Sequence, residues 1–227
     1  DIIPSAKLTF AFKERRTLPR PIIVFTSRNR GKLLEVTAEL SDISEVLGLD
    51  SFPEVGEPEE RGSSFLENAR LKALDYSKLL ASYFPHGALV LAEDAGLEIL
   101  TLNGFPGVHS SRIADTDEER IKLVLSKLDE ADYKDERSRF ARFVSAMVLV
   151  RGKSVLVEAE GEVHGIIAPK PHGTYGFGYD PVFFYLPYGR TFGDCTLDEK
   201  RAVSHRTMAL KRIKDYLSTS IIVKSMQ

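Results

Sequence analysis

Two adjacent carboxylates, Glu93 and Asp94, stand between two apolar runs in the stretch ALVLAEDAGLEILTL, residues 88–102. Acids at the end of a buried strand can hold a metal ion or take a proton from water. The alternative is a turn between two strands, with Asp94-Ala95-Gly96 as its corner. The pair indicates catalysis only if other segments supply positive charge and a substrate-binding surface.

A second candidate segment, SRNRGK (27–32), follows an apolar run and opens a predicted helix. Backbone N–H groups at a helix start favour anions, and Lys32 adds a full positive charge there. The segment is not a Walker A loop, because Leu33 rather than Ser or Thr follows the lysine. Taken alone, a plain strand-to-helix turn with a solvated basic rim explains it better than a phosphate site.

A third candidate is the pair Asn68 and Lys72, four residues apart on one face of a predicted helix at 63–82. This face is distinct from the apolar stripe of the same helix. A surface lysine is the usual interpretation. The sharper one is a lysine presented with Asn68 toward a phosphate.

The stretch GTYGFGYDP (173–181) alternates glycines with aromatic residues. Glycine permits close approach of the backbone to a ligand, and an aromatic ring can stack on a flat base. Asp180 could accept hydrogen bonds from a base edge. The alternative, a glycine–aromatic turn before an edge strand, accounts less well for this density of glycine and aromatic residues.

A cluster of donors in DEKRAVSHR (198–206) contains Lys200, His205 and Arg206. Such donors suit a polyanion or the carbonyl groups of a purine. A lone histidine is more often structural than catalytic, which leaves that alternative open for His205. The Ser204-His205 pair does not indicate a serine hydrolase, because the sequence has no G-x-S-x-G elbow.

The elements that must position these segments alternate between strand and helix. The patterns predict strands at 21–27, on both sides of the acids in 88–102, and in a hairpin over 142–163 that turns at Arg151-Gly152; they predict helices at 31–40, 63–82, 115–128 and from Ser204 to about Leu217. Capping boxes are predicted at Ser64-x-x-Glu67 and Thr116-x-x-Glu119, and cap chemistry recurs at Thr196-x-x-Glu199. The fold class is α/β, with a single domain over 21–220 and an extension or tail at 1–20.

Composition limits the classes of partner. The 227 residues include 31 basic and 33 acidic side chains, a net charge of −2 that favours neither nucleic acid nor an anionic membrane. Only the basic run at 13–20 would support a nucleic-acid-binding module. No apolar run approaches the roughly 20 residues that span a bilayer. Cys195 is the single cysteine, so no internal disulfide can form, and we expect a cytoplasmic protein.

Six segments in this order resemble the inosine triphosphate pyrophosphatase family: SRNRGK, ERGSSFLENARLKA, AEDAGLEI, GFPGVHSSR, GTYGFGYDPVF and SHRTMAL. The resemblance runs from about Ile22 to Leu217. It implies an elongated, two-lobed α/β fold with a central mixed sheet flanked by helices and a cleft between the lobes. It also implies a homodimer that uses Mg²⁺ to hydrolyse the purine nucleoside triphosphates ITP, dITP and XTP to the monophosphate and pyrophosphate.

The resemblance also implies roles for individual residues. Ser27, Asn29, Lys32 and Lys72 match positions that bind phosphate; Glu60, Glu93 and Asp94 match metal ligands, with Asp94 also the water-activating base. Ala95, Phe177, Gly178, Tyr179, Asp180, Lys200, His205 and Arg206 match positions that bind the substrate, most of them at its base.

Two departures from the family pattern fall at the acid pair. The usual DDSG reads Glu93-Asp94-Ala95-Gly96, so the first carboxylate has a longer arm and a hydroxyl near the substrate is lost. Both departures affect rate and metal preference more than reaction class. The alternatives are a weakly active nucleotide-binding protein and a pyrophosphatase for other modified nucleotides.

Overall fold

The computed structural model describes residues 20–59, 61–85, 87–131 and 136–225. In chain order its helices and strands are β1 (Ile22–Phe25), α1 (Arg30–Leu40), β2 (Glu45–Gly48), α2 (Phe65–Leu79), β3 (Leu89–Ile99), α3 (Asp117–Glu130), β4 (Phe140–Arg151), β5 (Ser154–Ile167), β6 (Phe183–Tyr185), β7 (Arg190–Thr191), α4 (Leu197–Arg201) and α5 (His205–Ser225).

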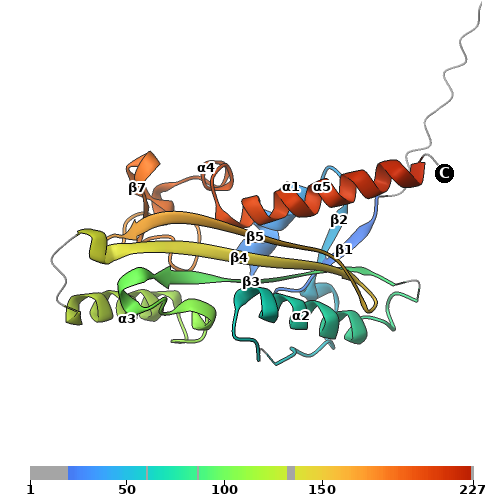
Figure 1. The fold of residues 1–227 in the computed structure, drawn as a ribbon, viewed down its shortest axis with the longest axis horizontal. Coiled ribbons are helices and arrows are strands. Elements are labelled where there is room, and N and C mark those ends of the chain that lie inside the picture. Colours follow the sequence, from blue (N-terminus) through green and yellow to red (C-terminus); the bar gives the residue numbers. More distant parts are fainter. Residues whose placement is uncertain (1–19, 60, 86, 132–135, 226–227) are drawn as a thin grey trace, which may run out of the picture.

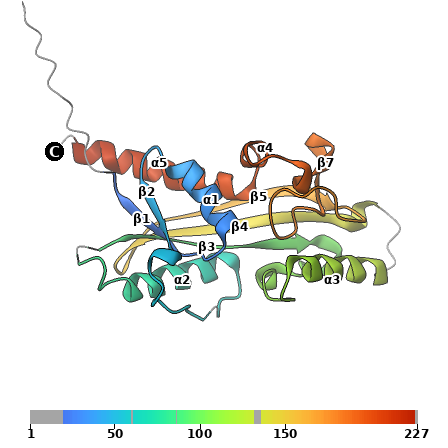
Figure 2. The same ribbon diagram turned by 180° about the vertical axis from the view of Figure 1, so that it is seen from behind.

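One mixed sheet of seven strands, in the order β2-β1-β3-β4-β5-β6-β7, forms the centre of the molecule. β1 pairs in parallel with β2 and β3, and every other neighbouring pair is antiparallel. The long strands β3, β4 and β5 run through the whole elongated body (Figure 1). β1, β2, α1 and α2 lie at one end, and α3, α4 and β7 lie at the other (Figure 2). The expected two-lobed α/β fold is therefore confirmed.

Side chains along β3 alternate between two different cores. Val90 and Ala92 belong to the core under α2, whereas Leu89 and Leu91 belong to the core under α1 and α5. This alternation follows from the two-residue period of a strand. Even-numbered residues further along β3 therefore lie on the same side of the sheet as Val90 and Ala92, and odd-numbered residues lie on the same side as Leu89 and Leu91.

The acid pair does not interrupt the strand. β3 continues through Glu93 and Asp94, which pair with Met147 and Ala146 of β4. The prediction of two strands flanking the acids is wrong, and so is the alternative of a turn at Asp94. Both carboxylates are tolerated inside a buried strand because each has a hydrogen-bond or ion-pair partner on its side of the sheet.

The predicted helix starts form with one difference. Thr116 and Thr196 each make a complete capping box, α3 beginning after the first and α4 after the second. Ser64 accepts a hydrogen bond from the backbone N–H of Glu67, but the Glu67 carboxylate accepts from Ser63 instead of Ser64. At Ser64 only one of the two hydrogen bonds of the predicted capping box forms, and the second is made by the preceding residue, Ser63.

Other boundaries differ in extent. The hairpin of β4 and β5 is confirmed at Gly152, whose φ of 58° suits the turn. α5 begins after Ser204 as predicted but continues to Ser225 rather than to about Leu217. The sequence patterns missed β2, a strand of four residues. The predicted extension at 1–20 lies outside the described residues except for Arg20. No helix in the described part of the chain has the length and hydropathy needed to cross a membrane.

Candidate active site

The first part of the site is the turn that connects β1 to α1. Asn29 caps α1 by accepting, through Oδ1, a hydrogen bond of 3.0 Å from the backbone N–H of Lys32. Ser27 Oγ accepts from the backbone N–H of Asn29 at 3.2 Å. Arg28 points away from this turn, because its guanidinium binds Glu57 and the carbonyl of Val55. The predicted helix start is therefore present, and Lys32, not Arg28, can supply positive charge to it.

This turn lies where the edge of β3 becomes accessible. β1 pairs with β3 only over Leu89–Leu91 and ends at Phe25, so the next residues of β3 have no strand beside them on that side among the described residues. Glu93 and Asp94 stand in this unpaired part of the edge. Elements from both sides of the sheet can therefore meet around it.

On the α2 side of the sheet, Asp94 is held by Asn68. Asn68 Nδ2 donates to Asp94 Oδ2 at 3.0 Å, and Asn68 Oδ1 accepts from the backbone N–H of Gly62 at 2.7 Å. Lys72, one turn further along α2, donates from Nζ to the carbonyl oxygen of Glu93 at 3.3 Å. The helix face predicted to present Asn68 and Lys72 thus points at the acid pair.

On the opposite side, Glu93 forms ion pairs. Its carboxylate accepts from Arg206 Nε at 2.8 Å and from Ser145 Oγ at 2.7 Å, and Lys32 Nζ lies 3.3 Å from its other oxygen. Burial raises the pKa of Glu93, but Arg206 and Lys32 outweigh burial and hold that pKa well below its usual range. Since Glu93 and Asp94 point to opposite faces, the two carboxylates do not converge on one metal position.

The ion pairs continue into a buried network. Arg206 also donates from Nη1 to Glu35, and Lys200 Nζ lies 2.9 Å from Glu35 and 2.6 Å from Asp180. Burial raises the pKa of Asp180, against the opposing charge of Lys200. With Lys32 and Glu93, the network contains three cations and three acids. Such pairing is what allows charges to remain in the interior.

The segment with alternating glycines and aromatic residues lies over this network. Lys200 Nζ is 4.4 Å from the centre of the Phe177 ring, and the Arg206 guanidinium is 5.5 Å from it. The backbone N–H of Gly178 donates to Asp117 of α3 at 2.7 Å. Tyr179 is buried, and its hydroxyl donates to the carbonyl of Ser110 at 2.7 Å, so the Tyr179 side chain anchors the segment.

His205 is the buried histidine of the site. Its ring stacks on Phe143, with centroids 4.9 Å apart, and its Nδ1 has no hydrogen-bond partner among the described residues. Burial lowers the pKa of His205 well below its usual value, and Arg206 and Lys200 lower it further. The imidazole is therefore neutral near pH 7, and its Nδ1 is a buried nitrogen whose hydrogen-bonding capacity is unmet among the described residues.

A pocket of about 100 Å³ joins these groups. Ten of the predicted site residues line it, namely Asn29, Lys32, Ala95, Phe177, Gly178, Tyr179, Asp180, Lys200, His205 and Arg206. Ser27, Lys72, Glu93 and Asp94 are not in its lining, and Glu60 lies outside the described residues. Lys72 and Asp94 lie on the α2 side of β3, opposite Lys32. Their charges still shift the pKa of Lys32, Lys72 lowering it and Asp94 raising it, so the groups on the two sides of the strand interact electrostatically.

Sequence reasoning missed three residues that hold this site together. Glu35 binds two of the predicted base-reading cations, Ser145 binds Glu93, and Asp117 binds Gly178. Glu35 had a sequence signal, because it lies three residues after Lys32 on the same helix face. Ser145 and Asp117 had none, since their partners are 52 and 61 residues away.

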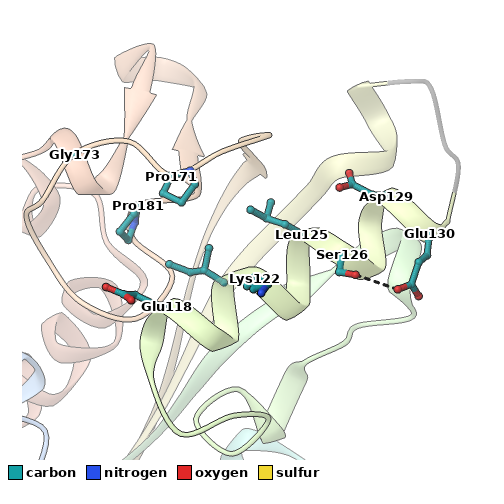
Figure 3. A pocket seen from close by; sticks show the side chains of 10 residues that line it. Glu118, Lys122, Leu125, Ser126, Asp129, Glu130, Pro171, Gly173 and Pro181 are labelled. Atoms are coloured by element: carbon teal, nitrogen blue, oxygen red, sulfur yellow. Dashed lines mark hydrogen bonds between the residues drawn. The ribbon is translucent and has the colours of Figure 1, made fainter.

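A larger hollow of about 870 Å³ lies elsewhere, between α3 and the chain at 171–181 (Figure 3). Leu125, Pro171 and Pro181 contribute apolar surface to it, and Glu118 and Lys122 contribute charge. None of the predicted site residues lines it. A binding site is expected to have convergent polar groups, and these belong to the smaller pocket.

The donor set suits a Mg²⁺ ion that completes its coordination with substrate oxygens and water, rather than a closed metal cage. In residues 20–59, 61–85, 87–131 and 136–225, no group of three or more His, Cys, Asp or Glu side chains could hold a metal ion. Mg²⁺ takes oxygen ligands and commonly binds through one or two carboxylates together with substrate phosphates. Asp94 is a carboxylate of this kind, whereas Glu93 is engaged by Arg206 and Lys32.

Proteins similar in sequence to this chain are named dITP/XTP pyrophosphatases. The chain is 40% identical to a dITP/XTP pyrophosphatase of Prochlorococcus marinus over 84% of this chain and 90% of the relative. It is 41% identical to a dITP/XTP pyrophosphatase of Exiguobacterium sibiricum over 87% of this chain and 97% of the relative.

Solved structures show the same fold. A HAM1 protein from Coxiella burnetii superposes with a TM-score of 0.76 at 36% identity, covering 88% of this chain and 99% of that one. The Staphylococcus aureus Ham1 protein superposes with a TM-score of 0.73 at 32% identity, covering 88% of this chain and 99% of that one. The model of the Ham1 family matches residues 23–216, and this chain therefore belongs to the Ham1 family.

Proposed function

We propose that this protein hydrolyses non-canonical purine nucleoside triphosphates, namely ITP, dITP and XTP, to the monophosphate and pyrophosphate. The relatives named dITP/XTP pyrophosphatase support the reaction class. The observation that carries the proposal is one pocket in which the capped start of α1, with Lys32, adjoins Phe177, His205 and Arg206. The pocket therefore has an anion-binding end and a base-binding end, so that a single nucleotide could occupy both.

The phosphate end is formed from both sides of the edge of β3. The helix start at Asn29 favours negative charge, and Lys32 adds a cation. Lys72 reaches the same edge from α2, where it donates to the Glu93 carbonyl. A triphosphate placed along this edge lies between the two lysines, so its phosphate charges are neutralised from opposite sides.

Asp94 is the proposed general base. Asn68 fixes the orientation of its carboxylate by donating to Oδ2, and the anchored Asn68 cannot rotate freely because Gly62 binds its other end. Asp94 then takes the proton of the water that attacks the α-phosphorus, and the bond between the α-phosphate and the bridging oxygen breaks to release pyrophosphate. Mg²⁺ is the proposed cofactor; Asp94 and Glu60 would hold it, and it would neutralise phosphate charge and make the attacking water more acidic.

The base end can distinguish a 6-oxo purine from adenine. The neutral His205 and the remaining N–H groups of Arg206 face a base that carries an oxygen at position 6. Adenine has an amino donor at this position, so it would leave buried donors without acceptors. Phe177 contributes stacking, which is similar for every base. Asp180 has a supporting role, since it binds Lys200 and the backbone N–H of Phe177.

Three further properties belong to this proposal. We expect a homodimer, a single catalytic domain over 21–220 preceded by an extension or tail at 1–20, and a cytoplasmic location. Light scattering measures the oligomeric state. Deletion of residues 1–20 with full retention of activity would support the domain assignment, whereas loss of activity would refute it.

The deciding experiment is a substrate panel with pyrophosphate detection. Wild type should release pyrophosphate from ITP, dITP and XTP much faster than from ATP, whose position 6 carries an amino group, and than from GTP, which shares the 6-oxo group and differs by its 2-amino group; release should require Mg²⁺. Asp94→Asn is the matched inactive control, because it keeps the size of the side chain and an acceptor for Asn68. Tight binding of ITP without pyrophosphate release would instead indicate a nucleotide-binding protein, and equal rates on all five nucleotides would refute the proposed specificity.

A further inference from the structure

We propose that Gly31 is a positioning residue for the nucleotide pocket, because its lack of a side chain lets the Phe177 ring lie against the first turn of α1. This proposal rests on the proposed function of the Phe177 pocket. It assigns a role to a residue that lies between the phosphate-binding Asn29 and Lys32 but carries no functional group of its own.

The contact leaves no room for any other residue at position 31. A Cβ atom on Gly31 would lie 2.3 Å from Cδ1 and 2.6 Å from Cε1 of Phe177, far inside carbon–carbon contact distance. Gly31 is not among the glycines with positive φ, so its backbone conformation does not require glycine. Glycine is also a poor helix former at the second position of α1. Space for the ring is the physical reason for a glycine here.

The ring cannot simply retreat from an added methyl group. On another side, the charged groups of Lys200 and Arg206 lie 4.4 and 5.5 Å from the centre of this half-buried ring. The backbone that carries the ring is also tied to the buried network, because the N–H of Phe177 donates to Asp180 at 2.9 Å. A displaced ring must therefore press on the buried cations or move into the pocket.

This contact couples the two ends of the proposed substrate site. The turn that precedes Gly31 is capped by Asn29, and Lys32 follows it directly. The Phe177 ring is the proposed stacking surface for the base. A single packing contact thus sets the position of the base-binding wall relative to the phosphate-binding helix start. The chemical step at Asp94, on the other side of β3, does not depend on it.

A double-mutant cycle with Gly31→Ala and Phe177→Ala tests the proposal. Gly31→Ala alone should raise the KM for ITP by between about fivefold and about a hundredfold, the range expected when one base–aromatic stack is lost, with kcat within about threefold of wild type. In the Phe177→Ala background the same change should alter KM by less than about twofold. Gly56→Ala is the matched control, since a Cβ there has nothing within 4 Å.

Melting temperatures provide an independent readout that needs no substrate. Gly31→Ala should lower the melting temperature in the wild-type background, where the methyl group collides with the ring. It should raise the melting temperature in the Phe177→Ala background, because alanine is the better helix former once the ring is gone.

Equal effects of Gly31→Ala in both backgrounds, on KM or on melting temperature, would overturn the proposal. The two proposals can also fail separately. If Gly31→Ala lowers the melting temperature in the wild-type background and raises it in the Phe177→Ala background, but wild type does not hydrolyse ITP, the contact between Gly31 and Phe177 is supported and the proposed function is refuted.

Discussion

Glu93→Gln separates two roles for the first acid of the pair: the metal ligand that the family resemblance implies, and the ion-pair partner of Arg206 and Lys32 in the structure. The Glu93 side chain is fully buried, and that of Arg206 is 2% exposed. Replacing Glu93 by glutamine keeps the shape and an acceptor oxygen but removes the charge that compensates Arg206 and Lys32. The structure predicts a loss of stability and little effect on metal binding, because Glu93 points away from Asp94.

The magnitude follows from the burial of the pair. Breaking a buried ion pair by removing one partner costs about 3–5 kcal/mol. Arg206 keeps Glu35 as a second partner, so the lower end, about 3 kcal/mol, applies here. For a chain of this size that loss lowers the melting temperature by roughly 6–12 °C. The control is Glu162→Gln, whose partner Arg142 is 44% exposed and whose surface ion pair contributes about 0–1 kcal/mol.

The pH dependence provides a second check on the same variant. Although burial raises the pKa of Glu93, Arg206 and Lys32 hold it below the usual value of 4.5. A group whose pKa is lowered by folding stabilises the protein above its unfolded pKa and loses that effect as the pH falls. The difference in unfolding free energy between wild type and Glu93→Gln should therefore be constant from about pH 6 to 8 and shrink in acid below about pH 4.5.

The assay is chemical denaturation of wild type, Glu93→Gln and Glu162→Gln at several pH values, together with the Mg²⁺ concentration that gives half-maximal ITP hydrolysis. Two results would refute the reasoning. One is a stability loss for Glu93→Gln no larger than that for Glu162→Gln. The other is an unchanged stability with a large rise in the Mg²⁺ requirement, which would make Glu93 a metal ligand.

Four other substitutions test the proposed division of roles. Asp94→Asn should lower kcat by roughly 10²–10⁴-fold, and a rate within twofold of wild type would remove Asp94 as the base. Lys32→Met and Lys72→Met should each weaken binding of ITP more than binding of the monophosphate, as measured by calorimetry; equal weakening would place the lysines away from the β- and γ-phosphates. His205→Phe should keep the stack on Phe143 but reduce the preference for ITP over ATP in kcat/KM. An unchanged preference would mean that other residues read the base.

Much of the local structure is determined by neighbouring residues in the sequence. Thr116 predicted the start of α3, and the cap chemistry predicted at Thr196 forms at the start of α4, because the bonds of a cap join residues only three apart. The hairpin at Gly152 and the buried strand β1 were readable for the same reason. The ordered segments that resemble one enzyme family also identified ten residues that the fold brings to one pocket.

The tertiary structure decided which way the acids point and what they bind. The sequence patterns placed a break at Glu93 and Asp94, since two acids in a buried strand are costly without partners. Those partners come from far away: Arg206 is 113 residues from Glu93, and Glu35 is 171 residues from Arg206. The contact of Gly31 with Phe177 likewise has no local signal. Hydrogen bonds within a turn are specified by adjacent residues, whereas the compensation of a buried charge depends on which distant elements pack together, and only the folded chain fixes that.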